Sequence, residues 1–214
     1  MPRHILRYVF VILVAWPVIL LWLALNVRNR ERLPRHGPAI IAANHNSHLD
    51  TLALLALFPL QLVPIVRPVA AADYFMRSRA MAWFARNVVG IVPVWRTGHR
   101  TGRGPLDECH AALNRGEILI IFPEGTRGEP EHMSELRCGI AHLVERHPDA
   151  PVVTVFMRGL GKSMPKGAIV PLPGAADICL AEPIRWTGTR DSFMAKLAAM
   201  FDRLRAELRT PDFT

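Results

Sequence analysis

Cysteine is scarce in this sequence of 214 residues, and its three copies, Cys109, Cys138 and Cys179, lie far apart. None of the spacings is that of a zinc ligand set, and an odd number of thiols is poor material for a disulfide framework. We therefore expect reduced thiols on the cytosolic side. Low-complexity segments, whether glycine- and serine-rich or charged, are also missing, which argues against two independent domains.

Acidic residues are outnumbered. There are 18 Asp and Glu against 26 Lys and Arg, which gives a formal net charge of +8. The mean hydropathy is nevertheless positive, at +0.18. This combination favours a protein that binds an anionic surface over one that is freely soluble. Charge alone leaves a nucleic acid open, but an apolar N-terminal segment favours membrane lipids, so we expect no nucleic-acid partner.

Charged residues are absent between Tyr8 and Val27. At helical rise such a run extends about 30 Å, the thickness of a hydrocarbon core, so we expect it to lie in or on a bilayer. Pro17 interrupts the run, which leaves a single span and a re-entrant or interfacial helix pair both open. The flanking arginines are Arg3, Arg7, Arg28, Arg30, Arg32 and Arg35.

The arginines crowd the C-terminal side of this run, where a cleaved signal peptide would carry small residues. The same bias places the following domain in the cytosol, at the inner membrane if the source is bacterial. We therefore divide the chain into an N-terminal membrane anchor, residues 1–32, and a catalytic domain, residues 33–214.

Beyond residue 37, short apolar runs alternate with amphipathic ones. This pattern predicts an α/β fold, with a mostly parallel central sheet flanked by helices after the N-terminal membrane-associated helical segment. The expected strands are 39–43, 62–66, 88–94, 118–122, 152–157 and 178–181. The expected helices are 48–57, 73–86, 105–114, 134–146 and 192–208.

A histidine and an aspartate stand close together after the first of these strands. His45 and Asp50 would point apart on one continuous helix, so the chain must turn between them. Ser47 supplies a helix start, and with Asp50 three residues later it has the form of a capping box. This leaves His45 on a loop and Asp50 in the first helical turn, where the carboxylate can orient the imidazole as a general base for an alcohol.

Two other interpretations of this stretch compete. Asp50 can be only a cap and His45 only a loop residue, because Ser-x-x-Asp before an apolar run is a common structural device. A metal cluster of His45, His48 and Asp50 lacks a convincing further ligand in the chain. We therefore expect no metal, and we place His48 on the surface of the first turn.

A second motif, Phe122-Pro-Glu-Gly-Thr-Arg127, follows another apolar strand. Gly125 permits close approach of the backbone, and Arg127 can bind a phosphate with two hydrogen bonds. Arg96 also follows an apolar strand, at the end where α/β sites usually lie. Together the motifs favour acyl or phosphoryl chemistry on a substrate with a hydroxyl group and negative charge.

These motifs, in this order and at about these separations, resemble the first three motifs of the glycerolipid acyltransferases. They are Asn44-His45-x-Ser47-x-x-Asp50, Gly90 to Arg96, and Phe122 to Arg127, and the nearest member type is 1-acyl-glycerol-3-phosphate acyltransferase. The segment Leu136-Arg-Cys-Gly139 is similar to the family's Phe-Lys-x-Gly, with arginine in the lysine position. The resemblance implies a membrane-associated α/β enzyme with an N-terminal helical anchor.

The resemblance also implies a mechanism. His45, oriented by Asp50, would take the proton of a lyso-lipid hydroxyl as that oxygen attacks an acyl thioester, either acyl-CoA or acyl carrier protein. No further cofactor is expected, and backbone N–H groups at the start of the helix after Ser47 would stabilise the oxyanion. Substrate binding falls to Arg96, Glu124, Gly125, Thr126 and Arg127.

Two departures from the family pattern leave the acceptor lyso-lipid open. Thr154 stands where the fourth motif usually has a proline, and Trp95 stands at an often polar position. Two further classes of function also remain. A membrane-bound hydrolase would release fatty acid or phosphate without an acceptor, and a non-catalytic membrane adaptor would not need His45 or Asp50.

Overall fold

The computed structural model describes residues 2–75, 78–95, 104–126, 128, 133–164 and 172–208. Its first helix is α1 (Pro2–Phe10), which continues through a π-helical turn (Val11–Ala15) into α2 (Trp16–Trp22). Seven strands follow: β1 (Leu23–Arg28), β2 (Ala39–Ala43), β3 (Val66–Ala71), β4 (Val92–Val94), β5 (Ile118–Ile121), β6 (Val152–Arg158) and β7 (Gly174–Leu180). The other helices are α3 (Leu49–Leu57), α4 (Ala72–Phe75), α5 (Arg79–Phe84), α6 (Asp107–Asn114), α7 (Gly139–Arg146), α8 (Leu160–Ser163) and α9 (Arg190–Glu207).

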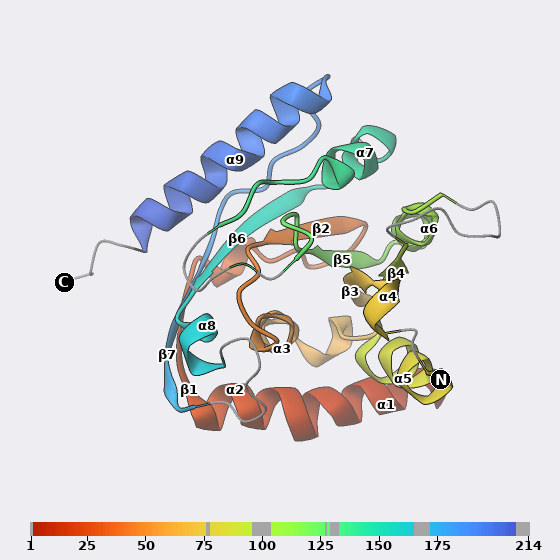
Figure 1. The fold of residues 1–214 in the computed structure, drawn as a ribbon, viewed down its shortest axis with the longest axis vertical. Helices are drawn as coiled ribbons and strands as arrows, with labels where there is room; N and C mark the ends of the chain where they lie inside the picture. Colours follow the sequence, from red (N-terminus) through yellow and green to blue (C-terminus); the bar gives the residue numbers. More distant parts are fainter. Residues whose placement is uncertain are drawn as a thin grey trace.

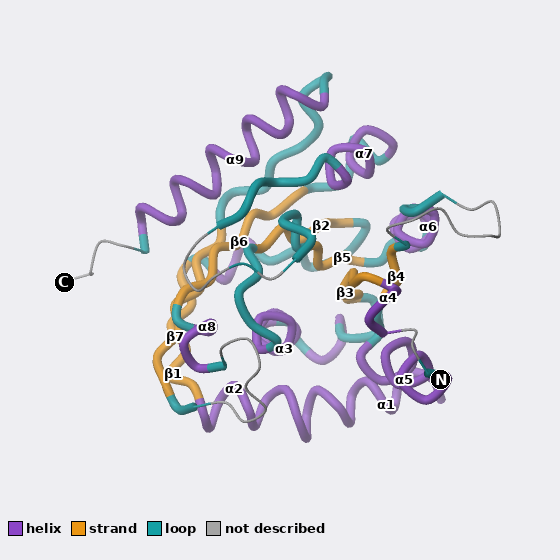
Figure 2. The backbone as a smooth tube through the Cα atoms, viewed as in Figure 1, coloured by secondary structure: helices purple, strands orange, loops and turns teal. Residues whose placement is uncertain are grey.

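The strands form one mixed sheet in the order β1-β7-β6-β2-β5-β3-β4. Neighbours pair in parallel except β6 and β7, which are antiparallel. Helices α6, α7 and α9 cover one face, while α3 and the long N-terminal helix cover the other (Figure 1). The backbone trace shows the same three layers (Figure 2). The predicted α/β class with a mostly parallel sheet is therefore confirmed.

Strand β2 illustrates why the central strands form where they do. All five of its residues are buried, as expected for a parallel strand with helices on both faces. Ile40 and Ala42 face the layer of α6, α7 and α9, whereas Ile41 faces α3. This alternation gives each face of the sheet its own hydrophobic core.

The segment expected to anchor the chain differs from the prediction at its C-terminal end. The helix ends at Trp22, and Leu23–Arg28 form an edge strand that pairs in parallel with β7. The boundary drawn at residue 33 thus follows a strand that already belongs to the sheet. Leu23, Leu25 and Val27 alternate in the sequence, a pattern typical of a strand.

Pro17 does not break the N-terminal helix. A π-helical turn, Val11–Ala15, precedes it, and Ala15 and Trp16 on its N-terminal side keep right-handed helical angles, so the chain stays helical through this position. The helix therefore runs on without a reversal (Figure 1). The stretch His4–Leu21 has a mean hydropathy of 2.1, and by length and composition it could cross a membrane.

Several other predicted boundaries were wrong. The expected strand 62–66 is a 3-10 turn (Leu60–Leu62) and a connection, and β3 begins only at Val66. The expected strand 88–94 keeps only Val92–Val94, because a π-helical turn (Ala85–Val89) ends at Gly90 with φ +86°. The predicted helix 73–86 is divided between α4 and α5.

Candidate active site

The two sequence motifs meet because their strands are neighbours. Strands β2 and β5 pair in parallel, with Ala42 opposite Ile121, so the loops that follow them leave the same edge of the sheet. The ring of His45 stacks on the ring of Phe122, with centroids 4.0 Å apart and planes at 19°. Two segments distant in the sequence thus form one site at the carboxyl edge of the sheet, where ligands bind in α/β folds.

His45 and Asp50 face each other across the turn that precedes α3. Nδ1 of His45 lies 2.9 Å from Oδ2 of Asp50. The aspartate side chain is 1% exposed, and the histidine side chain is 19% exposed. A buried carboxylate on Nδ1 leaves the lone pair of a neutral imidazole on Nε2, which is the arrangement of a general base.

Asp50 both holds the turn before α3 and is the partner of His45. Its Oδ2 also accepts hydrogen bonds from the backbone N–H groups of Asn46, at 2.6 Å, and Ser47, at 2.8 Å. The hydroxyl oxygen of Ser47 accepts from the N–H of Leu49, at 3.2 Å. The predicted turn therefore exists, and these bonds fix the carboxylate that holds the imidazole. The N-cap of α3 is however His48, and not Ser47 as predicted.

The same bonds reduce the number of N–H groups that could stabilise an oxyanion here. We expected backbone N–H groups at the start of α3 to stabilise an oxyanion. Those of Asn46 and Ser47 already donate to Asp50, that of Leu49 donates to the Ser47 hydroxyl, and that of Asp50 donates to the Ser47 carbonyl. These four donors are therefore committed to the turn itself.

Glu124 also differs from its expected place as a substrate contact. It is 1% exposed, and Oε1 accepts from the backbone N–H of His45 at 2.7 Å. Its other oxygen, Oε2, accepts from the N–H of Ser134 at 2.7 Å. The carboxylate thus lies inside the protein and connects the His45 loop to the segment before α7. Helix α7 begins at Gly139, five residues after the predicted start at Ser134.

The rest of the second motif reaches the surface. Gly125 is exposed with φ +70°, and a Cβ there would lie 2.8 Å from Cδ of Arg137. Thr126 is exposed as well. Arg127 and Arg96 lie outside the described residues, although β4, the strand that leads toward Arg96, pairs in parallel with β3 and so points to the same edge.

Two residues near the site have structural roles that the sequence motifs do not predict. The side-chain amide of Asn44 donates to the carbonyl of Met157 at 2.8 Å and accepts from its N–H at 2.7 Å, which joins the ends of β2 and β6. Arg137 is exposed and donates from Nε to the carbonyl of Glu124 at 3.3 Å. Arg137 therefore places a cation beside the loop that carries Gly125 and Thr126.

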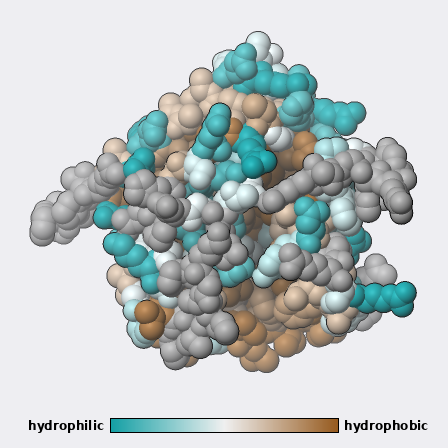
Figure 3. Space-filling model, viewed as in Figure 1, coloured by the Kyte–Doolittle hydropathy of each residue, from teal (hydrophilic) through white to brown (hydrophobic). Residues whose placement is uncertain are grey.

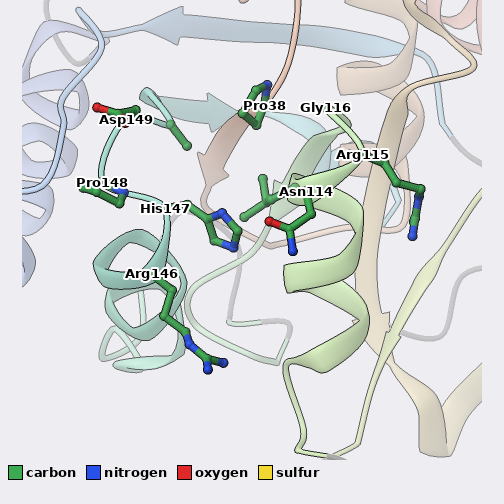
Figure 4. Close-up of a pocket in the computed structure, with 10 residues that line it drawn as sticks. Pro38, Asn114, Arg115, Gly116, Arg146, His147, Pro148 and Asp149 are labelled. Atoms are coloured by element: carbon green, nitrogen blue, oxygen red, sulfur yellow. The ribbon is translucent and has the colours of Figure 1, made fainter.

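His48 is exposed at the start of α3, as expected. Within the described part of the chain, no three His, Cys, Asp or Glu side chains gather in a way that could hold a metal ion. A pocket of about 510 Å³ lies beside His147, Arg115 and Pro38 (Figure 4). Pro38 and Gly116 precede β2 and β5, so this pocket is at the sheet edge opposite to His45.

A family model described as Acyltransferase matches residues 24–158, a stretch that contains His45, Asp50 and the whole second motif. The chain belongs to this acyltransferase family. The match begins inside β1 and ends with β6, so it includes the strands that bring the two motifs together.

Curated relatives of this acyltransferase carry related names. The chain is 30% identical over 145 residues to chloroplastic 1-acyl-sn-glycerol-3-phosphate acyltransferase LPAT1 of Arabidopsis thaliana, covering 67% of this chain and 38% of that protein. It is 24% identical over 187 residues to 1-acyl-sn-glycerol-3-phosphate acyltransferase alpha of Bos taurus, covering 86% and 61%. The chain thus spans less than two thirds of these relatives.

A solved structure supports the fold. The crystal structure of the 1-acyl-sn-glycerophosphate (LPA) acyltransferase PlsC from Thermotoga maritima superposes with a TM-score of 0.69 at 21% identity. The match covers 88% of this chain and 73% of the Thermotoga chain.

Proposed function

We propose that this acyltransferase transfers a fatty acyl group from an acyl thioester to the free hydroxyl of 1-acyl-glycerol-3-phosphate, which gives phosphatidate. The observation that carries the proposal is the contact of 2.9 Å between Nδ1 of His45 and the buried carboxylate of Asp50. The names of the curated relatives support this acceptor. Acyl-CoA and acyl carrier protein both fit as the donor.

His45 acts as the general base in this proposal. Nδ1–H of His45 donates a hydrogen bond to Asp50, so Nε2 is the nitrogen that takes the proton of the acceptor hydroxyl as that oxygen attacks the thioester carbonyl. The C–S bond then breaks, and the thiolate takes the proton from the imidazolium. Phe122 stacks on the imidazole and limits its rotation, so that the base is held in one orientation.

The phosphate of the acceptor needs cations near this base. Arg137, beside the exposed Gly125 and Thr126, is one candidate among the described residues. Arg96 and Arg127 remain the candidates that the sequence predicts. We assign Glu124 a positioning role, because its carboxylate accepts the backbone N–H of His45. A buried carboxylate with two hydrogen bonds holds the loop more rigidly than an exposed one.

We also propose that the N-terminal helix attaches the enzyme to a membrane with the active site on the cytosolic side. The apolar stretch His4–Leu21 supports the attachment. The arginines after the helix support the orientation, because positive charge is retained on the cytosolic side. A lyso-lipid acceptor is itself a membrane component, so attachment brings enzyme and substrate together.

The test is a direct assay of acyl transfer. The full chain, purified in detergent, is mixed with acyl-CoA or acyl carrier protein thioesters and with lyso-lipids that carry or lack a phosphate. Mass spectrometry then identifies the products. We expect phosphatidate from the phosphate-bearing acceptor, and we expect His45→Gln to remove this product.

His48→Gln is the matched control, because His48 lies three residues away in the same segment but is exposed. It should retain activity. Transfer at an undiminished rate by the His45→Gln protein would contradict the role of the base. Release of free fatty acid in the absence of any acceptor would instead identify a hydrolase.

A further inference from the structure

The long N-terminal helix has two unlike sides. Val11, Ala15 and Ile19 are at most 1% exposed and pack on the protein. The other side, which we call the outer face, carries large apolar side chains that are 38% to 80% exposed. They are Ile5, Leu6, Val9, Ile12, Leu13, Val14, Leu20 and Leu21. The helix thus lies along the domain and keeps an apolar outer face (Figures 1 and 3).

Helix α5 exposes a second group of apolar side chains. Met81, Trp83 and Phe84 are 44%, 55% and 43% exposed. The helix is nevertheless well formed at its start, because the hydroxyl oxygen of Ser78 accepts from the backbone N–H of Met81 at 3.1 Å. Half of the six residues of α5 are thus large apolar side chains exposed to solvent, and Met81 and Phe84, three residues apart, share one side of the helix.

The two groups are connected. The ring of Phe84 meets the ring of Phe10 edge-on, with centroids 6.1 Å apart. The π-helical turn that follows α5 also packs against α1. Because Phe84 is partly exposed while it touches the N-terminal helix, the apolar surface continues from that helix onto α5.

We propose that α5 is a second bilayer-contacting element, inserted beside the N-terminal helix at the level of the lipid headgroups. The inference rests on the proposed membrane attachment of that helix. A tryptophan between apolar neighbours suits the membrane interface, where its ring is amphipathic. Arg79 and Arg86 at the two ends of α5 suit anionic headgroups, since long cationic side chains reach toward phosphates.

Charge also favours lipid over a second copy of the chain. A symmetric pairing of two α5 helices would bring Arg79 and Arg86 of both copies together, on a protein whose net charge is already +8. Glu108, 3.5 Å from Arg86, offsets only one of the two cations on each copy, through an exposed ion pair. An anionic leaflet complements that charge. Helix α5 leads through Ala85–Val89 into β4, which points to the active-site edge, so a lipid contact at α5 lies on the chain segment that approaches the acceptor site.

The experiment uses tryptophan quenching by lipids with brominated acyl chains. One full-length variant keeps only Trp83, with the other four tryptophans replaced by phenylalanine. The matched control keeps only Trp186, which packs on Phe193 in the layer of α9, with ring centroids 6.2 Å apart. A third variant lacks all five native tryptophans and carries Leu13→Trp on the outer face. Vesicles contain phosphatidylcholine and phosphatidylglycerol.

We expect a strong loss of Trp83 fluorescence on these vesicles and no loss for Trp186. Quenching of the Leu13→Trp reporter without quenching of Trp83 would overturn the role of α5 and leave the attachment of the N-terminal helix standing. No quenching of either would overturn both. A lipid-free dimer that shields Trp83 from iodide would overturn the proposal in favour of a copy interface.

Hydrogen exchange on the wild-type chain tests the same contact between α5 and lipid without any substitution. Amides 78–84 should exchange more slowly on vesicles than in solution, whereas amides 190–207 of α9 should not change. Equal exchange of 78–84 in both conditions would contradict the contact.

Discussion

The guanidinium of Arg7 lies directly against the backbone of Gly90. Arg7 is 4% exposed, and its two terminal nitrogens donate to the carbonyls of Pro64 and Val66. A Cβ at Gly90, where φ is +86°, would overlap the guanidinium. An arginine expected to flank a membrane segment is thus buried against residues of the sheet and its connections, and it joins the N-terminal helix to the connection that leads into β4.

The first prediction concerns this contact. Gly90→Ala should destabilise the protein by about 1 to 2 kcal/mol through its left-handed backbone alone, with the overlap adding to that cost. Arg7→Ala should cost at least about 2 kcal/mol, because it leaves buried carbonyls without donors. Urea denaturation of the full chain measures both changes in the free energy of unfolding.

The double variant separates strain from overlap. Once Arg7 is absent, Gly90→Ala has no guanidinium to overlap. The double variant should therefore lose less free energy of unfolding than the two single variants lose together, by about 1 kcal/mol. Strict additivity would show that the two residues do not touch in solution.

The second prediction concerns Asp50→Asn. The amide oxygen can still accept from the backbone of the turn, but the negative charge that orients the protonated Nδ1 of His45 is lost. We expect kcat to fall by about 10² to 10⁴-fold with a smaller change in KM, as for loss of the carboxylate that orients a catalytic histidine. Steady-state assays measure this fall in kcat, and an unchanged circular dichroism spectrum shows that the variant is folded. A kcat within a few-fold of wild type would leave Asp50 only its role in holding the turn before α3.

The third prediction separates positioning from substrate binding at Glu124. In Glu124→Gln only one side-chain oxygen remains for the N–H groups of His45 and Ser134, so one of them loses its acceptor. We expect lower kcat and lower stability together. Glu135→Gln is the control, because Glu135 is exposed nearby. A change confined to the KM of the acceptor would instead assign Glu124 to the substrate.

The sequence predicts best those strands that are uninterrupted apolar runs. Strand β2 matches its predicted bounds, Ala39–Ala43, because every one of its residues is buried. Strand β1 was missed, since its alternation at Leu23, Leu25 and Val27 follows an apolar helix without a break in composition. Only the pairing with β7 distinguishes a continued helix from an edge strand at that point.

The part of the site that the sequence predicts is the part formed by residues close together in the chain. His45 and Asp50 are five residues apart, so a turn and a cap suffice to bring them together. Glu124 accepts from His45 because β2 and β5 are neighbours, which is a fact of strand order that the motif spacing does not contain. The clamp between Asn44 and Met157 depends likewise on the pairing of β2 with β6.

The fourth prediction concerns Thr154, which stands at the family's usual proline position. It is fully buried in β6, and its hydroxyl oxygen has no hydrogen-bond partner among the described residues. Thr154→Val keeps the shape of the side chain and removes the hydroxyl group that lacks a partner, so it should stabilise the protein by about 1 kcal/mol. Calorimetry should then show a Tm about 2 to 4 °C higher. Thr154→Ser, which keeps the hydroxyl and loses a methyl group, should lower the Tm.

The fifth prediction concerns pH and a histidine pair beside the pocket of Figure 4. Nδ1 of His110 lies 3.0 Å from Nε2 of His147, which joins α6 to the end of α7. Burial, the charge of Arg146 and the facing imidazole lower the pKa of His110, and burial and Arg146 lower the pKa of His147. Both groups therefore bind protons more weakly in the folded chain than in the unfolded chain.

Because the unfolded chain binds more protons, this pair stabilises the fold fully only above the ordinary histidine pKa of about 6.5. The contribution is lost as the pH falls from there through the lowered folded pKa values. Urea titrations at a series of pH values should show a smaller loss of stability on acidification in His147→Gln than in wild type, because that variant has one fewer group to protonate. His142→Gln, an exposed change on α7, is the control and should keep the wild-type profile. Parallel profiles for all three proteins would show that the pair does not couple folding to pH.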